Sequence, residues 1–212
     1  MSEEAELRRE LVEMGALLYT RQLAHGSAGN LSVRLEDGAI LVTPTNSSLG
    51  SLDADRISKV TPGGELVSGD RPSKEYVFHL AVYEARPAAR AVVHLHSTYS
   101  VAVSCLDHQQ CEEALPPLTA YYVMRVGGLP LVRYFRPGDR ALADEVRQVA
   151  REHRSMLLAN HGPIVSGASL KEAVQAYEEL EETAKIFFIL GDRPTSPLTA
   201  EDIADINRAF RS

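Results

Sequence analysis

The segment 91–96, Ala-Val-Val-His-Leu-His, constrains the fold of this chain more than any other stretch. Four of its six residues are apolar, and a short run of this kind is typical of a strand buried inside a sheet. We therefore expect it to be a central strand. Side chains at i and i+2 point to the same face of a strand, so His94 and His96 are predicted to project together.

Helical and extended patterns alternate around this strand. Helices are expected over 3–23, 73–86, 98–105, 140–153 and 170–190, with a short final helix after Thr199. Strands are expected over 31–35, 39–43, 57–61, 65–67, 91–96 and 156–160, the first four as two hairpins. Ser73 is the expected N-cap of its helix, and Gly191 is expected to end the long one. Without internal repeats or Gly/Ser linkers, residues 1–212 are predicted to form one mixed α/β domain.

Composition limits the classes of partner. The 212 residues are 44% hydrophobic and 24% charged, which is typical of a globular protein. Lys and Arg total 22 against 29 Asp and Glu, and this net charge of −7 argues against nucleic acid or an anionic membrane as partner. The longest apolar run, 186–190, is too short to span a bilayer. Cys105 and Cys111 form no CxxC pair, and we expect a reduced, cytoplasmic protein without a membrane segment.

Histidines suggest a metal site. His161 follows the expected strand 156–160, where a third imidazole can join His94 and His96 in a site of the kind zinc uses, and Glu75 offers a carboxylate. The alternative is that the imidazoles only pack or lie at the surface, although in a central strand they need hydrogen-bond partners. The other histidines have no partner at ligand spacing and are predicted to be solvated or locally hydrogen-bonded: His25, His79, His108 and His153.

Small polar residues form three clusters that suit an anion. Residues 26–30, Gly-Ser-Ala-Gly-Asn, lie between a helix and a strand, where backbone N–H groups can converge on a phosphate. An ordinary helix end and turn is the alternative. Hydroxyl groups also gather at 43–48 and 71–74, and Ser73 opens a helix whose dipole favours an anion. The acidic residues between 178 and 182 are predicted to form a solvated helix face.

Four motifs occur in an order that resembles the class II aldolase and adducin family. They are residues 26–30, Ser73-Lys74-Glu75, His94-Leu95-His96 and Asn160-His161-Gly162, and the resemblance spans nearly the whole chain. The resemblance implies a three-layer domain with a mixed, largely antiparallel central sheet flanked by helices. It also implies a homotetramer with sites at subunit boundaries.

The resemblance assigns roles to particular residues. It implies a divalent metal, usually zinc, held by His94, His96 and His161, with Glu75 as an acid/base that can also coordinate it. Candidate phosphate-binding residues are Gly29, Asn30, Thr43 and Ser73. A tyrosine before the paired glycines acts as an acid in aldol cleavage, and both Tyr121 and Tyr122 lie near that place. The chain departs from many aldolases at Thr43-Pro44 and Ser73-Lys74, and Lys74 is a candidate for holding a second anionic group, or else a solvated lysine.

The longer segments 72–75, 93–98, 158–163 and 179–185 resemble the decarboxylases of the family. The resemblance implies metal-dependent loss of CO₂ from a small phosphorylated β-keto acid of four carbons, giving dihydroxyacetone phosphate. The metal-ligand residues do not distinguish this reaction from that of a sugar-phosphate aldolase or epimerase. A non-catalytic module of the adducin kind is a third possibility, and retention of the metal-ligand residues argues against it.

Overall fold

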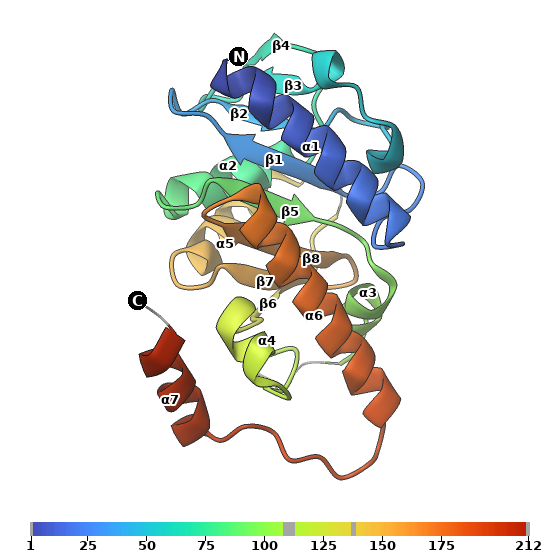
Figure 1. Ribbon diagram of the computed structural model, residues 1–212, viewed down its shortest axis with the longest axis vertical. Helices are drawn as coiled ribbons and strands as arrows, with labels where there is room; N and C mark the ends of the chain where they lie inside the picture. Colours follow the sequence, from blue (N-terminus) through green and yellow to red (C-terminus); the bar gives the residue numbers. More distant parts are fainter. Residues whose placement is uncertain (1, 108–112, 137–138, 211–212) are drawn as a thin grey trace.

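The computed structural model describes residues 2–107, 113–136 and 139–210, and within them it contains an eight-stranded sheet (Figure 1). The strands are β1 (Asn30–Arg34), β2 (Ile40–Val42), β3 (Ser58–Val60), β4 (Leu66–Ser68), β5 (Ala91–His94), β6 (Leu131–Val132), β7 (Ser155–Leu158) and β8 (Gly162–Gly167). Their order is β4-β3-β2-β1-β5-β8-β7-β6, and every neighbouring pair is antiparallel except β6 and β7. The expected mixed, largely antiparallel sheet is confirmed.

Helices cover both faces of this sheet, so the fold has three layers (Figure 1). The α-helices are α1 (Glu3–Thr20), α2 (Tyr76–Ala85), α3 (Thr98–Ser104), α4 (Ala120–Arg125), α5 (Arg140–Ala150), α6 (Leu170–Leu190) and α7 (Ala200–Phe210). Two short 3₁₀ helices span Leu49–Ser51 and Ala54–Arg56. Helices α1, α3, α4 and α6 lie on one face, whereas α2 and α5 pack together on the other.

Strand β5 contributes to both cores, as expected for a central strand. Val93 belongs to the core under α1 and α6, as does Leu95 just after the strand, and Val92 belongs to the core under α2 and α5. β5 pairs with β1 on one side and β8 on the other, with Asn30 and Ile164 opposite His94. The start of β1, the end of β5 and the start of β8 therefore meet at one place in the sheet.

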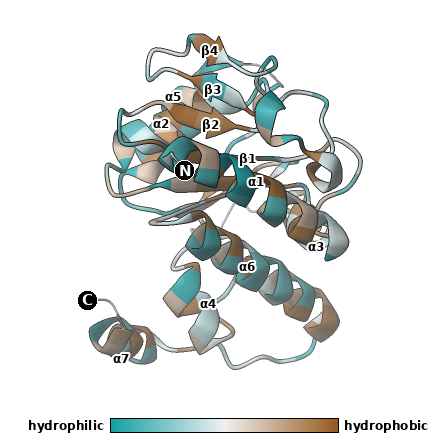
Figure 2. Ribbon diagram, turned by 45° about the horizontal axis from the view of Figure 1, so that its top comes forward, coloured by the Kyte–Doolittle hydropathy of each residue, from teal (hydrophilic) through white to brown (hydrophobic). Residues whose placement is uncertain are grey.

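One edge of the sheet, formed by β4, is apolar and exposed to solvent. Strand β4 is an edge strand whose Leu66 and Val67 are 48% and 57% exposed. Figure 2 shows this strand in the hydrophobic colour at the outer margin of the molecule. The helix α7 lies at the other extremity, where it contacts α4 and follows a long segment after Gly191 (Figure 1).

Three elements lay outside the sequence prediction: β8, β6 and α4. β8 has the sequence Gly-Pro-Ile-Val-Ser-Gly, whose glycines and proline are typical of turns rather than strands. β6 has two residues and α4 has six, within a stretch rich in proline and glycine. Short elements of this kind depend on tertiary contacts more than on local pattern.

The predicted start of α2 was wrong. The helix begins at Tyr76, and Glu75 rather than Ser73 occupies the N-cap position without a side-chain capping bond. Ser73 instead accepts a hydrogen bond from the Glu75 N–H through its hydroxyl oxygen, at 3.3 Å, before the helix starts. The carboxylate of Glu75 is thereby left for other partners.

The prediction of a wholly solvated acidic face on α6 was also wrong. Glu181 is only 8% exposed, and its two carboxylate oxygens accept hydrogen bonds from the N–H groups of Tyr99 and Ser100 at 2.8 and 2.9 Å. Glu181 therefore satisfies the free N–H groups in the first turn of α3, which the sequence of α6 alone does not reveal.

One of the two cysteines lies within the described residues. Cys105 is an exposed free thiol, whereas Cys111 and His108 lie outside the described residues. In the described part of the chain, none of the helices has the length and apolar character needed to cross a membrane.

Candidate metal and substrate site

Four predicted residues meet where β1, β5 and β8 converge. One ligand atom from each of Glu75, His94, His96 and His161 lies within 4.8 Å of the others. His94 is fully buried, while the side chains of Glu75 and His161 are 27% and 26% exposed. The cluster thus has a closed base and a side that solvent and a small ligand can reach.

Local structure brings these residues from three parts of the chain. His94 ends β5 and His96 follows it, so both point the same way as the alternation predicts. His161 lies in the tight turn between β7 and β8, beside Asn160 at φ 55°. The His161 N–H contacts both the Leu158 carbonyl and the Ser104 hydroxyl oxygen, at 3.1 Å each. The turn is therefore held by α3 as well as by the hairpin.

The three imidazole rings are arranged almost symmetrically. Their centroids are 4.9, 4.8 and 4.7 Å apart, and each pair of ring planes meets at 73–74°. His94 donates from Nδ1 to the Pro163 carbonyl at 2.9 Å, which leaves the lone pair of Nε2 facing the cluster. Burial lowers the pKa of His94 to about 3 and that of His96 to about 4. Both rings are neutral at pH 7, as metal ligands must be.

Glu75 is held as a carboxylate by its neighbours. Burial opposes its ionisation, but His94, His161 and a hydrogen bond from Asn30 together keep its pKa well below the usual range. Asn30 donates from Nδ2 to Oε2 at 2.6 Å, and Oε1 lies 3.2 Å from Nε2 of His161. The charge of this carboxylate is therefore directed at the imidazoles.

The donor atoms fit a divalent metal ion. Ligand atoms bound at zinc–nitrogen distances of about 2.0–2.1 Å in a tetrahedron lie about 3.3 Å from each other. Nε2 of His94 is 3.0 Å from Nε2 of His96 and 3.5 Å from Oε2 of Glu75. Three neutral imidazoles and one carboxylate are also a donor set that zinc accepts. Both these distances between ligand atoms and the chemical types of the donors therefore suit a divalent metal ion.

The candidate phosphate-binding residues border this cluster. Asn30 also donates to the Ser73 hydroxyl at 3.2 Å, and the Ser73 N–H donates to the Thr43 carbonyl at 3.2 Å. Thr43 is only 1% exposed, and its hydroxyl oxygen accepts from the Leu31 N–H, so its side chain faces the interior. Gly29 has φ 83°, and a Cβ there would lie 2.9 Å from the His94 carbonyl oxygen, so only glycine fits beside β5.

Lys74 and the two tyrosines differ in their position in the fold and in their exposure to solvent. Lys74 is exposed between Ser73 and Glu75 in sequence, next to the cluster. Tyr121 and Tyr122 both lie in α4, but Tyr121 is 58% exposed and Tyr122 only 2%. Burial, with a contribution from Glu113, raises the pKa of Tyr122.

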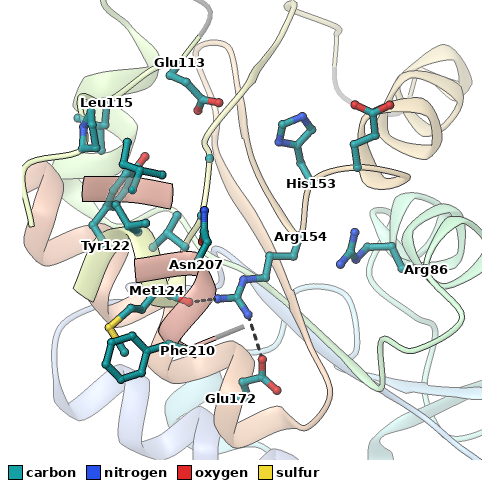
Figure 3. A pocket seen from close by; sticks show the side chains of 17 residues that line it. Arg86, Glu113, Leu115, Tyr122, Met124, His153, Arg154, Glu172, Asn207 and Phe210 are labelled. Carbon is teal, nitrogen blue, oxygen red and sulfur yellow. Dashed lines mark hydrogen bonds and ion pairs between the residues drawn. The ribbon is translucent and has the colours of Figure 1, made fainter. Parts of the chain in front are cut away.

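Tyr122 lines a separate cavity of about 830 Å³, whose lining includes none of the four candidate metal ligands (Figure 3). Arg154 crosses this cavity, donating to the Met124 carbonyl at 2.6 Å and pairing with Glu172 at 3.1 Å. The cavity is large, but it lacks the metal-ligand residues, so we place the candidate reaction at the histidine cluster.

His79 was not predicted as part of the site. It is fully buried, and Nε2 lies 2.5 Å from Oδ1 of Asn30, the residue that contacts Glu75. The expectation of a solvated or locally bonded side chain was wrong about its exposure and its partners, because both partners are in β1. The available signal was its position four residues after Glu75, on the same side of a helix that is otherwise apolar there.

Comparison with known proteins identifies the family of this chain. Residues 9–188 match the family described as "Class II Aldolase and Adducin N-terminal domain". The chain is 52% identical to 3-oxo-tetronate 4-phosphate decarboxylase from Pectobacterium atrosepticum, covering 98% of this chain and 95% of the relative. It is 31% identical to L-fuculose phosphate aldolase from Escherichia coli, covering 99% and 96%.

A solved structure agrees over the whole chain. The structure of YgbL from Escherichia coli, described as a putative aldolase, epimerase or decarboxylase, superposes with a TM-score of 0.94 at 51% identity and covers 100% of both chains. Sequence, fold and relatives agree, and the chain belongs to the class II aldolase and adducin family.

Proposed function

We propose that this protein is a metal-dependent 3-oxo-tetronate 4-phosphate decarboxylase, a carboxy-lyase. The observation that supports this most strongly is identity of about half over nearly the full chain with relatives of that name, against 31% with the fuculose phosphate aldolases. The cluster of Glu75, His94, His96 and His161 supports a metal-dependent reaction. A non-catalytic module has no need of such a cluster.

The substrate is a β-keto acid, with a carboxylate, a hydroxyl-bearing carbon, a ketone and a phosphate ester. When the bond to the carboxylate breaks, CO₂ leaves and its electron pair stays on the hydroxyl-bearing carbon. One proton added to that carbon gives dihydroxyacetone phosphate. A divalent metal ion held by His94, His96 and His161 supplies Lewis acidity, which stabilises the negative charge that develops next to the ketone.

Because Glu75 is ionised, it is proposed to relay the proton: its carboxylate takes a proton from solvent water and delivers it to the carbon, directly or through a water that it holds. Its carboxylate is fixed by Asn30 at Oε2, while Oε1 lies on the side of His161. General acid/base groups in such positions contribute about 10²- to 10⁴-fold to the rate. The same carboxylate can also coordinate the metal.

Residues around the cluster are proposed to hold the two anionic ends of the substrate. Gly29 and Ser73 are proposed to bind the phosphate. Asn30 and Thr43 contribute by holding Ser73, since Asn30 donates to its hydroxyl and the Thr43 carbonyl accepts from its N–H. Lys74, exposed beside them, is proposed to contact the carboxylate that an aldolase substrate lacks.

Zinc is the metal that we propose, because three imidazoles and a carboxylate suit it. We also propose a homotetramer that acts in the cytoplasm, where phosphorylated metabolites are kept. Exposed apolar side chains are available for subunit contacts: Tyr121, Tyr134, Ile189 and Phe210. Tyr121 and Tyr122 stay the candidates for the acid of aldol cleavage in the alternative reaction, and Tyr121 is the exposed one of the two.

The products distinguish the proposed reaction from its alternative. Metal-replete protein is incubated with 3-oxo-tetronate 4-phosphate, and dihydroxyacetone phosphate is measured through NADH oxidation by glycerol-3-phosphate dehydrogenase. The same protein is incubated with L-fuculose 1-phosphate, and aldehyde is measured. The proposal expects product from the keto acid and little aldehyde from the sugar. Aldehyde formation without decarboxylation supports the aldolase alternative, for which the 31% identical relatives are the specific observation.

A further inference from the structure

His79 is a fully buried titratable group that the proposed reaction does not use. Its Nε2 lies 2.5 Å from Oδ1 of Asn30, and its Nδ1 lies 2.7 Å from the hydroxyl of Ser32. The Ser32 hydroxyl lies 2.8 Å from the hydroxyl of Tyr83, and Asn30 donates to Glu75 at 2.6 Å. Five side chains therefore form one continuous hydrogen-bonded chain that ends on the Glu75 carboxylate.

The carboxylate fixes the direction of this chain. An ionised carboxylate only accepts hydrogen bonds, so the amide nitrogen of Asn30 must face Glu75 and its oxygen must face His79. An amide oxygen only accepts, so Nε2 of His79 carries the proton and Nδ1 presents a lone pair. Ser32 then donates to Nδ1, so the single proton of the Tyr83 hydroxyl is shared between the hydroxyl and carbonyl oxygens of Ser32, at 2.8 and 3.0 Å.

Burial keeps the chain intact and His79 neutral. Ser32 and His79 are fully buried and Asn30 is 2% exposed, so little bulk water competes for these contacts. Burial also lowers the pKa of His79 to about 4, so the ring carries a single proton at pH 7. Hydrogen bonds that run in one direction strengthen one another in such surroundings.

We propose that His79 is a positioning residue: with its proton on Nε2, it holds the Asn30 amide in one orientation and thereby aims the Glu75 carboxylate at the imidazole cluster. This inference rests on the proposed function in one respect, which is the role of Glu75 in the reaction. Without His79, Oδ1 of Asn30 loses its donor, and the amide can rotate away from the position in which it donates to Glu75.

The tautomer is tested directly by NMR of the purified full-length protein without substrate. Spectra of ¹⁵N-histidine-labelled protein distinguish a protonated ring nitrogen from one with a lone pair, and His79→Gln identifies the signals by their loss. The expected result is a neutral ring with protonated Nε2 at pH 7. A proton on Nδ1, or on both nitrogens, overturns the proposal whether or not the protein is a decarboxylase.

The positioning role is tested by two substitutions. The amide of Gln can still donate to Asn30 Oδ1, whereas Leu has a similar volume and cannot donate. We expect His79→Leu to lower kcat for dihydroxyacetone phosphate formation by about 10- to 100-fold, because losing the hydrogen-bond partners that orient metal-ligand residues has an effect of this size. KM is expected to change less than about threefold. His79→Gln is expected to recover most of kcat. A thermal melt of each variant separates these effects from unfolding.

Other results overturn the role. Unchanged kcat in His79→Leu, or equal losses in the folded Leu and Gln variants, means that the hydrogen bond to Asn30 does not position Glu75. If the Leu variant does not fold, the comparison of His79→Gln with wild type decides, since a loss of more than about tenfold contradicts the proposal. If wild-type protein forms no dihydroxyacetone phosphate, the proposed function fails, and the NMR result still stands.

Discussion

At the scale of single residues, the site combines neutral imidazoles with one fixed charge. The histidines are neutral because burial lowers their pKa values, to about 3 for His94 and about 4 for His96. Glu75 stays ionised in the same surroundings, where the Asn30 amide donates a hydrogen bond to its carboxylate. The carboxylate is thus the residue whose chemistry is easiest to remove without changing the shape of the site.

Glu75→Gln is expected to retain the fold and lower kcat by about 10²-fold or more, because the amide cannot deliver the proton. Steady-state assays of dihydroxyacetone phosphate formation measure this. Glu84→Gln is the matched control, since Glu84 lies on the same helix in an exposed ion pair with Arg147. Near-normal turnover of the Glu75 variant removes this residue from the mechanism.

Lys74→Gln is expected to raise KM for the keto acid by about tenfold, the effect of losing one charge-assisted hydrogen bond, with little change in kcat. Lys171→Gln, which changes another exposed lysine, serves as the control. An unchanged KM assigns Lys74 to the solvated surface, which is the alternative reading of its position.

At the scale of elements, two sets of hydrogen bonds fix the turn that carries His161 and the helix α3 beside it. The β7–β8 turn places His161 against α3, through the bond from the His161 N–H to the Ser104 hydroxyl. α3 in turn is capped from α6, because Glu181 accepts from two N–H groups of its first turn. The position of His161 therefore depends on packing between helices as well as on the strand order.

Glu181→Ala is expected to lower the free energy of unfolding by about 1–3 kcal/mol, because two buried N–H groups lose a charged acceptor. Glu182→Ala, at an exposed position that pairs with Lys185 at 3.8 Å, is expected to change it by less than about 0.5 kcal/mol. Urea unfolding of the two variants measures both. Equal effects contradict the capping role of Glu181.

At the scale of the whole molecule, buried neutral histidines make stability depend on pH. The pKa of His79 is about 4 when folded, below its value in the unfolded chain, so the unfolded state binds more protons between about pH 6.5 and 4. Stability is complete above this window and is lost as the pH falls through it. Metal-free protein is thus expected to lose stability between pH 7 and 5, before the carboxylates titrate.

His79→Gln is expected to reduce this loss by up to about 1.4 kcal/mol per pH unit, the value for one proton. Urea unfolding at pH 7, 6 and 5 in the presence of a chelator gives the slopes for the variant and for wild type. Identical slopes mean that His79 is protonated in the folded state or accessible to solvent, contrary to its burial.

The sequence predicted the parts of the molecule that follow local periodicity. The central strand, the pairing of His94 with His96 and the long helix follow from alternation or helical spacing. His161 and Glu75 come from distant segments: their positions after a strand and at the start of a helix suggested them as partners of that pair, and the family resemblance assigned them as metal ligands. That residues 1–212 form a single domain stays a prediction.

The parts that were missed depend on tertiary packing. Glu181 and His79 each bond to another element, and nothing in their own helices indicates which element that is. The strand β8 was hidden by the glycines and proline of its sequence, although Pro163 contributes the carbonyl that orients His94. These contacts depend on how the helices pack, which periodicity does not report.

The proposed activity depends on one divalent metal ion held by Glu75, His94, His96 and His161. Protein stripped with a chelator is titrated with zinc, and formation of dihydroxyacetone phosphate from 3-oxo-tetronate 4-phosphate is followed at each addition. We expect negligible activity without metal and a rise that levels off at one zinc per chain. Full activity in demonstrably metal-free protein, or no activity at any zinc concentration, contradicts this metal-dependent function.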